Sequence, residues 1–191
     1  DGHHRVSSSV LLAKELRTKH SDNTGEEPFN YLLGIFFAEN EVTIYEYNRL
    51  VKDLNGLSKE DLLKQLSEKF DVSANGKTPV RPQKQHIFGM YLDGDWYRFS
   101  LKKKFNERKE FSISTGASIL SELVLAPVLH IHDLRKDKRI DFVSGVKGME
   151  DLKLKVDSGD YAAAFTLCPL GVEQLFQIAD KTYIFVGESV K

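Results

Sequence analysis

Three kinds of ionisable side chain lie together in the opening motif, Asp1-Gly2-His3-His4-Arg5. Imidazole and guanidinium groups donate hydrogen bonds to anions, and a glycine lets the backbone approach a ligand closely. Residues 6–19 follow with loose helical spacing, so the N-terminus of a helix is expected beside the motif, where it attracts negative charge. We therefore predict an anion site here, in which Asp1 holds a histidine in one tautomer or binds a metal.

The opening motif has two plainer interpretations. It could be a frayed end of the chain, or the cap of the following helix, because Asp and Gly are common at that position. No third ligand follows at a fixed local spacing, so we assign no metal to the motif.

Arg49 is the second candidate for binding an anion. Residues 29–37 are nearly all apolar and predict a buried central strand, and residues 42–47 predict a second strand that ends at Asn48-Arg49-Leu50-Val51. Sites are common where strands end, so Arg49 is a candidate anion donor. The alternative is a solvated arginine.

His130-Ile131-His132-Asp133 resembles a ligand cluster, because alternate residues of a strand share one face. The cluster comes just after an expected helix, however. We therefore favour polar capping over metal binding for these residues.

The remaining pattern predicts an α+β fold with a mixed or antiparallel sheet, β-hairpins and packed helices. Residues 86–101 predict a hairpin around the turn Asp93-Gly94, and Ser58 is a helix N-cap. We expect one α+β region over 1–191, with a possible sub-boundary in a loop and potential lid at 71–85. Further helices are expected at 114–129, 148–158 and 171–179, and further strands at 140–145, 161–167 and 182–186.

Composition limits the classes of function. The 191 residues are 41% hydrophobic and 29% charged, with 27 basic and 28 acidic residues and a net charge of -1. This balance argues against strong non-specific nucleic-acid binding by the whole chain, although not against a local patch. Cys168 is the only cysteine, which excludes a disulfide framework within the chain and favours a reducing, cytoplasmic setting. No stretch predicts a membrane span or a signal peptide.

Several blocks in order resemble one family, the domain of unknown function 1015 family, which is often labelled Spo0J/ParA/ParB/RepB-like. The blocks are the opening motif and residues 45–51, 88–97, 118–129, 140–143 and 162–165, and the resemblance covers nearly the whole chain. Family members are about twice this length, so the resemblance implies a C-terminal half whose site is completed by a missing N-terminal half. Gly116-Ala117 replaces the usual Leu-Asp, and Asp180-Lys181 runs directly into Thr182. These departures suggest missing segments near 112–117 and 181–182.

The opening motif also looks like the phosphate-binding signature of ParB-like and sulfiredoxin-like domains. That resemblance implies phosphate contacts from Gly2, His3, His4 and Arg5, with Asp1 orienting a base or a metal. Relatives in this broad group bind CTP, hydrolyse nucleotides or phosphorylate a serine-type hydroxyl. The implied ligand is a phosphate or a nucleotide with Mg²⁺.

Three functions follow as hypotheses. The first is a nucleotide-dependent phosphotransferase or hydrolase acting on a small metabolite, with Asp1, His3 and His4 as catalytic residues. The second is a ParB-like DNA-partitioning protein, which the near-neutral charge and the absence of a clear helix-turn-helix pattern argue against. The third is a non-catalytic scaffold in which the histidines cap a helix.

Overall fold

The computed structural model describes residues 3–20, 22–106 and 115–181. The chain divides into two compact units, Asp1–Val42 and Thr43–Lys191. We refer to them as unit 1 and unit 2, and describe each by itself.

Unit 1 consists of one long helix and an extended segment. Helix α1 spans His3–Lys19, which confirms the helix expected there, and short 3-10 helices follow at Pro28–Asn30 (η1) and Glu39–Glu41 (η2). Arg17 Nε donates to Asn30 Oδ1 at 2.6 Å, and the rings of His20 and Phe29 stack with centroids 6.0 Å apart. These contacts join the end of α1 to η1.

The prediction of a buried central strand at 29–37 is wrong. Residues 31–38 form no regular element, and each of them is exposed. A strand that is apolar on both faces needs neighbouring strands and a layer on each side. The described part of unit 1 supplies neither.

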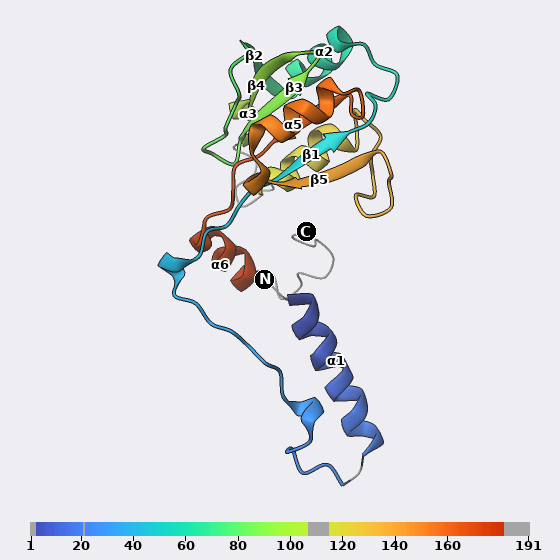
Figure 1. The fold of residues 1–191 in the computed structure, drawn as a ribbon, viewed down its shortest axis with the longest axis vertical. Coiled ribbons are helices and arrows are strands. Elements are labelled where there is room, and N and C mark those ends of the chain that lie inside the picture. Colours follow the sequence, from blue (N-terminus) through green and yellow to red (C-terminus); the bar gives the residue numbers. More distant parts are fainter. Residues whose placement is uncertain (1–2, 21, 107–114, 182–191) are drawn as a thin grey trace. The chain divides into compact units, whose positions relative to one another are not determined.

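Unit 2 is built on one six-stranded sheet with the order β2-β4-β3-β6-β1-β5 (Figure 1), in which every neighbouring pair is antiparallel. This confirms the predicted α+β class with an antiparallel sheet. The strands are β1 Tyr47–Val51, β2 Phe70–Gly76, β3 Ile87–Leu92, β4 Asp95–Leu101, β5 Ile140–Ser144 and β6 Ala163–Thr166.

Helices cover both faces of this sheet. One face packs against α2 and the continuous helix formed by α4 and the π-helical turn η3, with Phe88, Phe99 and Phe165 in the core. The other face packs against α5, with Leu50, Trp96 and Leu152 in a second core (Figure 1). The helical elements of unit 2 are α2 Lys59–Lys69, α3 Lys103–Asn106, α4 Gly116–Leu120, η3 Ser121–Leu125, η4 Gly145–Lys147, α5 Gly148–Asp157 and α6 Val172–Lys181.

The hairpin and the helix cap follow the sequence closely. Asp93 and Gly94 both have positive φ, 50° and 78°, which is the backbone that a two-residue turn between β3 and β4 requires. Ser58 caps α2 by accepting the Asp61 N–H at 3.1 Å, as predicted. Short-range chemistry determined both features.

Two strand predictions need correction. The strand expected at 42–47 lies instead at Tyr47–Val51, where β5 and β6 pair with it on either side. The first part of the loop predicted at 71–85 is the edge strand β2. Its outward positions carry exposed polar residues such as Asp71 and Ser73, so the stretch lacks the apolar alternation of a strand. The final strand predicted at 182–186 lies outside the described residues.

In the described part of the chain, no helix is long and apolar enough to cross a membrane.

Gly89 lets the chain cross the second face of the sheet. A Cβ atom at Gly89 would lie 2.3 Å from Thr166 Oγ1 and 2.7 Å from Val80 Cβ. Thr166 Oγ1 itself donates to the carbonyl of Val80 at 2.8 Å, which fixes the segment around residue 80 against β6. Because Gly89 of β3 has no side chain, the segment around Val80 fits against the sheet at this point.

We expect Gly89→Ala to lower the free energy of unfolding by about 1–3 kcal/mol, because the methyl group overpacks this crossing. Urea denaturation of the variant and the wild type measures the difference. Lys64→Ala, at an exposed position of α2, is the control and should change stability by less than about 0.5 kcal/mol. Equal stability of Gly89→Ala and wild type would contradict the close approach.

Candidate functional site

The ladder between β1 and β6 opens at the end where β1 begins. Arg49 is paired with Phe165, and the same register would pair Asn48 with Thr166 and then Tyr47 with Leu167. Instead, the Leu167 N–H is donated to Asn48 Oδ1 at 3.1 Å, and the Tyr47 carbonyl accepts a short hydrogen bond from Arg49 Nη1. Two side chains thus replace the backbone bonds of the ladder.

Arg49 is a buried cation at this opening. Only 7% of the residue is exposed, so it is not the solvated arginine of the alternative interpretation. Its guanidinium carbon lies 4.4 Å from the centre of the Phe142 ring, and Phe165 is its neighbour on β6. Burial lowers the pKa of Arg49 to about 10, so the group remains a cation at neutral pH.

One edge of the Arg49 guanidinium is available for a ligand. Nη1 is taken by the Tyr47 carbonyl, whereas the buried Nε has no hydrogen-bond partner. Among the described residues, Nη2 likewise has no partner and no carboxylate pairs with Arg49. Nε–H and Nη2–H point in parallel from the same edge, which matches two oxygens of a phosphate or a carboxylate.

Asn48 is the second polar group with unused capacity at the opening. It is 1% exposed, and its Nδ2 atom is buried without a partner while its Oδ1 atom holds Leu167. Because residues 48 and 49 are consecutive in a strand, their side chains leave opposite faces of the sheet. Sequence reasoning identified Arg49 but missed Asn48. The signal was a pair of polar residues immediately before the apolar Leu50-Val51.

The opening motif lies in unit 1. His3, His4 and Arg5 form the first turn of α1 instead of preceding the helix, and His4 and Arg5 are exposed. Asp1 and Gly2 lie outside the described residues. The structure thus places the described part of the motif where the first N–H groups of a helix lack partners within that helix. Arg49, the other predicted anion donor, belongs to unit 2.

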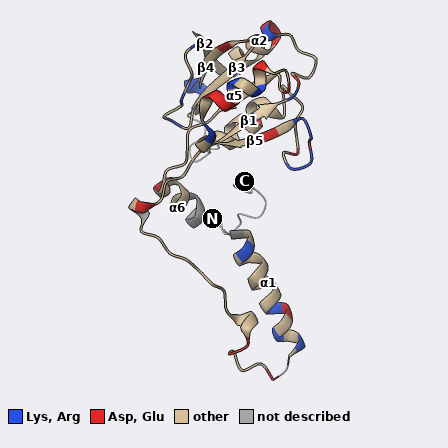
Figure 2. Cartoon of the chain, in the orientation of Figure 1, with Lys and Arg blue, Asp and Glu red and all other residues tan. Residues whose placement is uncertain are grey.

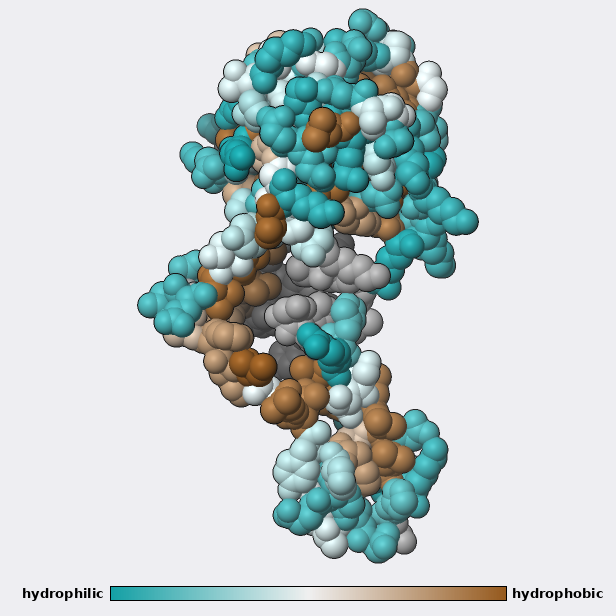
Figure 3. Space-filling view, in the orientation of Figure 1, coloured by the Kyte–Doolittle hydropathy of each residue, from teal (hydrophilic) through white to brown (hydrophobic). Residues whose placement is uncertain are grey.

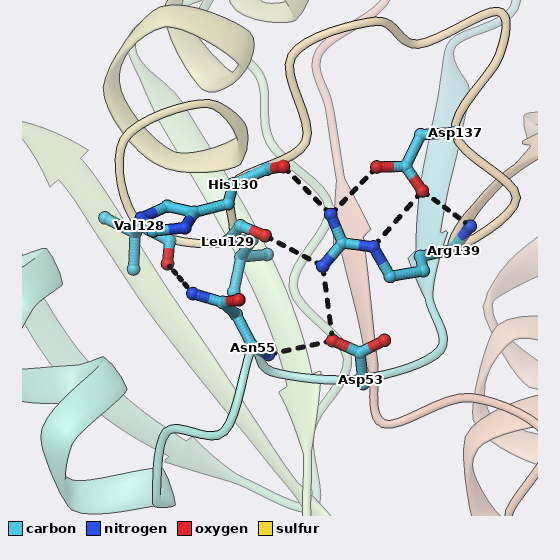
Figure 4. Close-up of polar contacts among 7 residues, drawn as sticks. All are labelled: Asp53, Asn55, Val128, Leu129, His130, Asp137 and Arg139. Carbon is cyan, nitrogen blue, oxygen red and sulfur yellow. Dashed lines mark hydrogen bonds and ion pairs between the residues drawn. The ribbon is translucent and has the colours of Figure 1, made fainter.

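The predicted cluster His130-Ile131-His132-Asp133 is held at His130 by Arg139, which sequence reasoning did not single out (Figure 4). Arg139 Nη1 donates to the Leu129 carbonyl at 3.1 Å, and Nη2 donates to the His130 carbonyl at 2.9 Å. Nε and Nη2 also bind the two carboxylate oxygens of Asp137, at 3.2 and 2.8 Å. The polar capping expected from the histidines is made by a guanidinium on backbone carbonyls.

The same guanidinium reaches the loop after β1. Arg139 Nη1 lies 3.5 Å from Asp53 Oδ1, which also accepts the Asn55 N–H at 2.9 Å. Asn55 Nδ2 donates to the Val128 carbonyl at 3.4 Å (Figure 4). We call these contacts the Arg139 clamp, because they join residues 53–55 to residues 128–139. The segment at residues 128–139, which the clamp holds, carries many basic residues (Figure 2).

The two histidines of the cluster stack on each other, with ring centroids 6.2 Å apart. The described residues contain no group of three or more His, Cys, Asp or Glu side chains that could hold a metal ion.

One comparison with known proteins gives a match. The family described as "Protein of unknown function (DUF1015)" matches residues 1–126. The chain belongs to this family. No curated protein and no solved structure matches the chain.

The DUF1015 match contains the opening motif, Arg49 and Asn48. It ends before Phe142 and Phe165, the aromatic neighbours of Arg49. The Arg49 guanidinium therefore lies within the matched part, whereas both aromatic neighbours lie beyond it.

Substitutions at Asn48 and Arg49 should separate structural from functional roles in this DUF1015 chain. Asn48→Ala leaves the Leu167 N–H without its acceptor, so we expect a loss of about 1–3 kcal/mol. Arg49→Met removes a buried charge and keeps the apolar stem, so stability should be unchanged or rise by up to about 2 kcal/mol. Urea denaturation compares both variants with the wild type. A large loss of stability in Arg49→Met would identify Arg49 as a structural residue.

The Arg139 clamp should stabilise unit 2 in a pH-dependent way. Arg139→Met should cost about 1–2 kcal/mol near neutral pH, because hydrogen bonds from a charged group are lost. The Arg139 guanidinium holds the pKa of Asp137 below its ordinary value of 3.8. The carboxylate contribution is therefore present above that value and lost as the pH falls below it.

Unfolding measured at neutral pH and at about pH 3 tests this sign. The difference in the free energy of unfolding between the wild type and Arg139→Met should be smaller at about pH 3 than at neutral pH. Arg135→Met is the matched control, because Arg135 is exposed in the same loop and should matter by less than about 0.5 kcal/mol. A gap that widens in acid would contradict the assigned role of Asp137.

Proposed function

We propose that this protein binds a phosphate-bearing small molecule, with nucleotides as the leading class, and that Arg49 contacts the phosphate. One observation carries the proposal: a nine-tenths buried arginine presents an Nε–Nη2 edge with no partner among the described residues. Keeping a desolvated cation without a counter-charge costs stability. A bound anion would remove that cost, and a phosphate offers two oxygens for the two donors.

The surroundings of Arg49 favour the binding of an anion. Phe142 and Phe165 lower the local dielectric around the guanidinium, so an ion pair formed there is stronger than one in water. The unpartnered Nδ2 of Asn48 shows a second unfilled hydrogen-bond capacity at the same strand end.

The proposal extends to phosphoryl transfer on a small metabolite, with a nucleotide and Mg²⁺ as the source of the phosphoryl group. Such a reaction depends on positioning and on neutralising charge. In this proposal Asp1, His3 and His4 are the catalytic residues, and Gly2 and Arg5 add phosphate contacts. The opening motif and Arg49 belong to separate units, so each is tested on its own.

Isothermal titration with inorganic phosphate, phosphoserine, ATP and CTP, with and without Mg²⁺, tests binding directly. We expect binding of at least one of these ligands and a loss of about tenfold to a hundredfold in affinity for Arg49→Met, because the hydrogen bonds from a charged group are worth about 1.5–3 kcal/mol. Arg98→Met removes an exposed arginine of β4 and should leave the affinity unchanged.

The opening motif is tested by the triple variant His3→Ala, His4→Ala, Arg5→Met in the same titrations. Weaker binding assigns phosphate contacts to α1, and unchanged binding restricts them to Arg49. If no ligand binds the wild type under any condition, phosphate binding is ruled out. If a ligand binds equally well to Arg49→Met, the assignment of Arg49 is wrong.

A further inference from the structure

Unit 1 has almost no hydrophobic core. Ala13 is its only buried apolar residue among those that the structure describes, with 8% exposure. The apolar side chains of the unit are instead exposed, most of all Leu33 at 90% and Phe36 at 95%. The others are Val6, Val10, Leu11, Leu12, Tyr31, Leu32, Ile35, Phe37 and Val42. A surface of this kind in a soluble protein marks an interface.

The exposed apolar residues of unit 1 lie in two places, on helix α1 and in the extended segment. Val6, Val10 and Leu11 lie on α1, and residues 31–37 lie in the extended segment, which we call the apolar segment (Figure 3). The part of the chain that the structure describes supplies no backbone partner for the amide groups of residues 32–37. An extended, uncharged stretch whose backbone groups have no partner can pair with a strand of another chain.

The apolar segment is nearly symmetric about Gly34. Leu33 and Ile35 flank the glycine, Leu32 and Phe36 come next, and Tyr31 and Phe37 follow. In an antiparallel pair of identical segments centred on Gly34, each apolar residue would face an apolar residue of the partner. A two-fold interface of this type is isologous and closes at two copies.

The available area is sufficient for a dimer. Each aromatic side chain buries about 150–250 Å² when covered, and a stable interface buries about 800 Å² per partner. Tyr31, Phe36 and Phe37 are 61%, 95% and 69% exposed, and the exposed Leu and Ile residues of the unit add to them. The exposed apolar side chains of unit 1 therefore offer an area of the size that a stable dimer requires.

Acidic residues limit the pairing to the apolar segment. Glu26 and Glu27 precede it and Glu39 and Glu41 follow it. In the symmetric register Glu27 would face Glu41 of the second copy, so the like charges oppose extension of the pair beyond the segment. Charged residues beside an apolar strand also oppose open-ended aggregation.

We propose that the chain forms a two-fold dimer in which the apolar segments of two copies pair as antiparallel strands around Gly34, and α1 covers the pair. The proposal is independent of phosphate binding, because it rests on unit 1 alone and requires nothing of Arg49.

Light scattering after size-exclusion chromatography of the full chain tests the assembly. The wild type should have twice the monomer mass at micromolar concentrations, and the double variant Leu33→Lys, Phe36→Lys should have the monomer mass. Leu154→Lys is the matched control, because Leu154 is 65% exposed on α5 of unit 2, and it should remain dimeric. Salt should strengthen the dimer, since it screens the acidic flanks.

A cysteine at the two-fold axis tests the register. In a Cys168→Ser background, Gly34→Cys should give a disulfide-linked dimer on mild oxidation, because the two sulfur atoms would be directly opposite. Leu154→Cys in the same background should not. A monomeric wild type, a dimer that survives Leu33→Lys, Phe36→Lys, or a monomer whose apolar segment is covered by a different polypeptide would overturn the proposal.

Discussion

The cost of a buried positive charge is the constraint that shapes the opening between β1 and β6 in unit 2. Arg49 occupies a position on β1 that a sheet core normally fills with an apolar residue, and Phe142 and Phe165 replace its water. The opening of the β1–β6 ladder partly offsets that cost, because it makes the Tyr47 carbonyl available to Nη1. Asn48 then binds the amide of Leu167 that the ladder no longer holds.

Local chemistry explains which parts of the fold could be predicted from sequence. The Asp93-Gly94 turn and the Ser58 cap depend on residues within a few positions of each other, and both predictions were confirmed. Strands depend on partners that are distant in the sequence. The apolar run at 29–37 has the composition of a central strand but no neighbour among the described residues, whereas the polar β2 forms a strand because β4 pairs with it.

The candidate site shows the same division. Arg49 was a candidate because sites are common where strands end, although in the structure it lies within β1. Its burial and its free Nε–Nη2 edge could not be predicted, because they depend on Phe142 of β5 and Phe165 of β6. Arg139 was hidden for a similar reason. A run of basic residues indicates a solvated turn, and only the folded loop directs that one guanidinium inward to the carbonyls of Leu129 and His130.

The position of β6 in the sheet has a consequence for synthesis on the ribosome. β6 lies between β3 and β1, yet it is the last described strand to leave the ribosome. The β2-β4-β3 group and the β1-β5 pair can each form earlier, but they cannot join before Thr166 has emerged. Until then, β3 and β1 each present an open strand edge to other nascent chains. The nascent chain is therefore most vulnerable to mispairing between the synthesis of Leu92 and that of Thr166. In this period, chaperones that shield apolar strand edges would have the greatest effect on its yield.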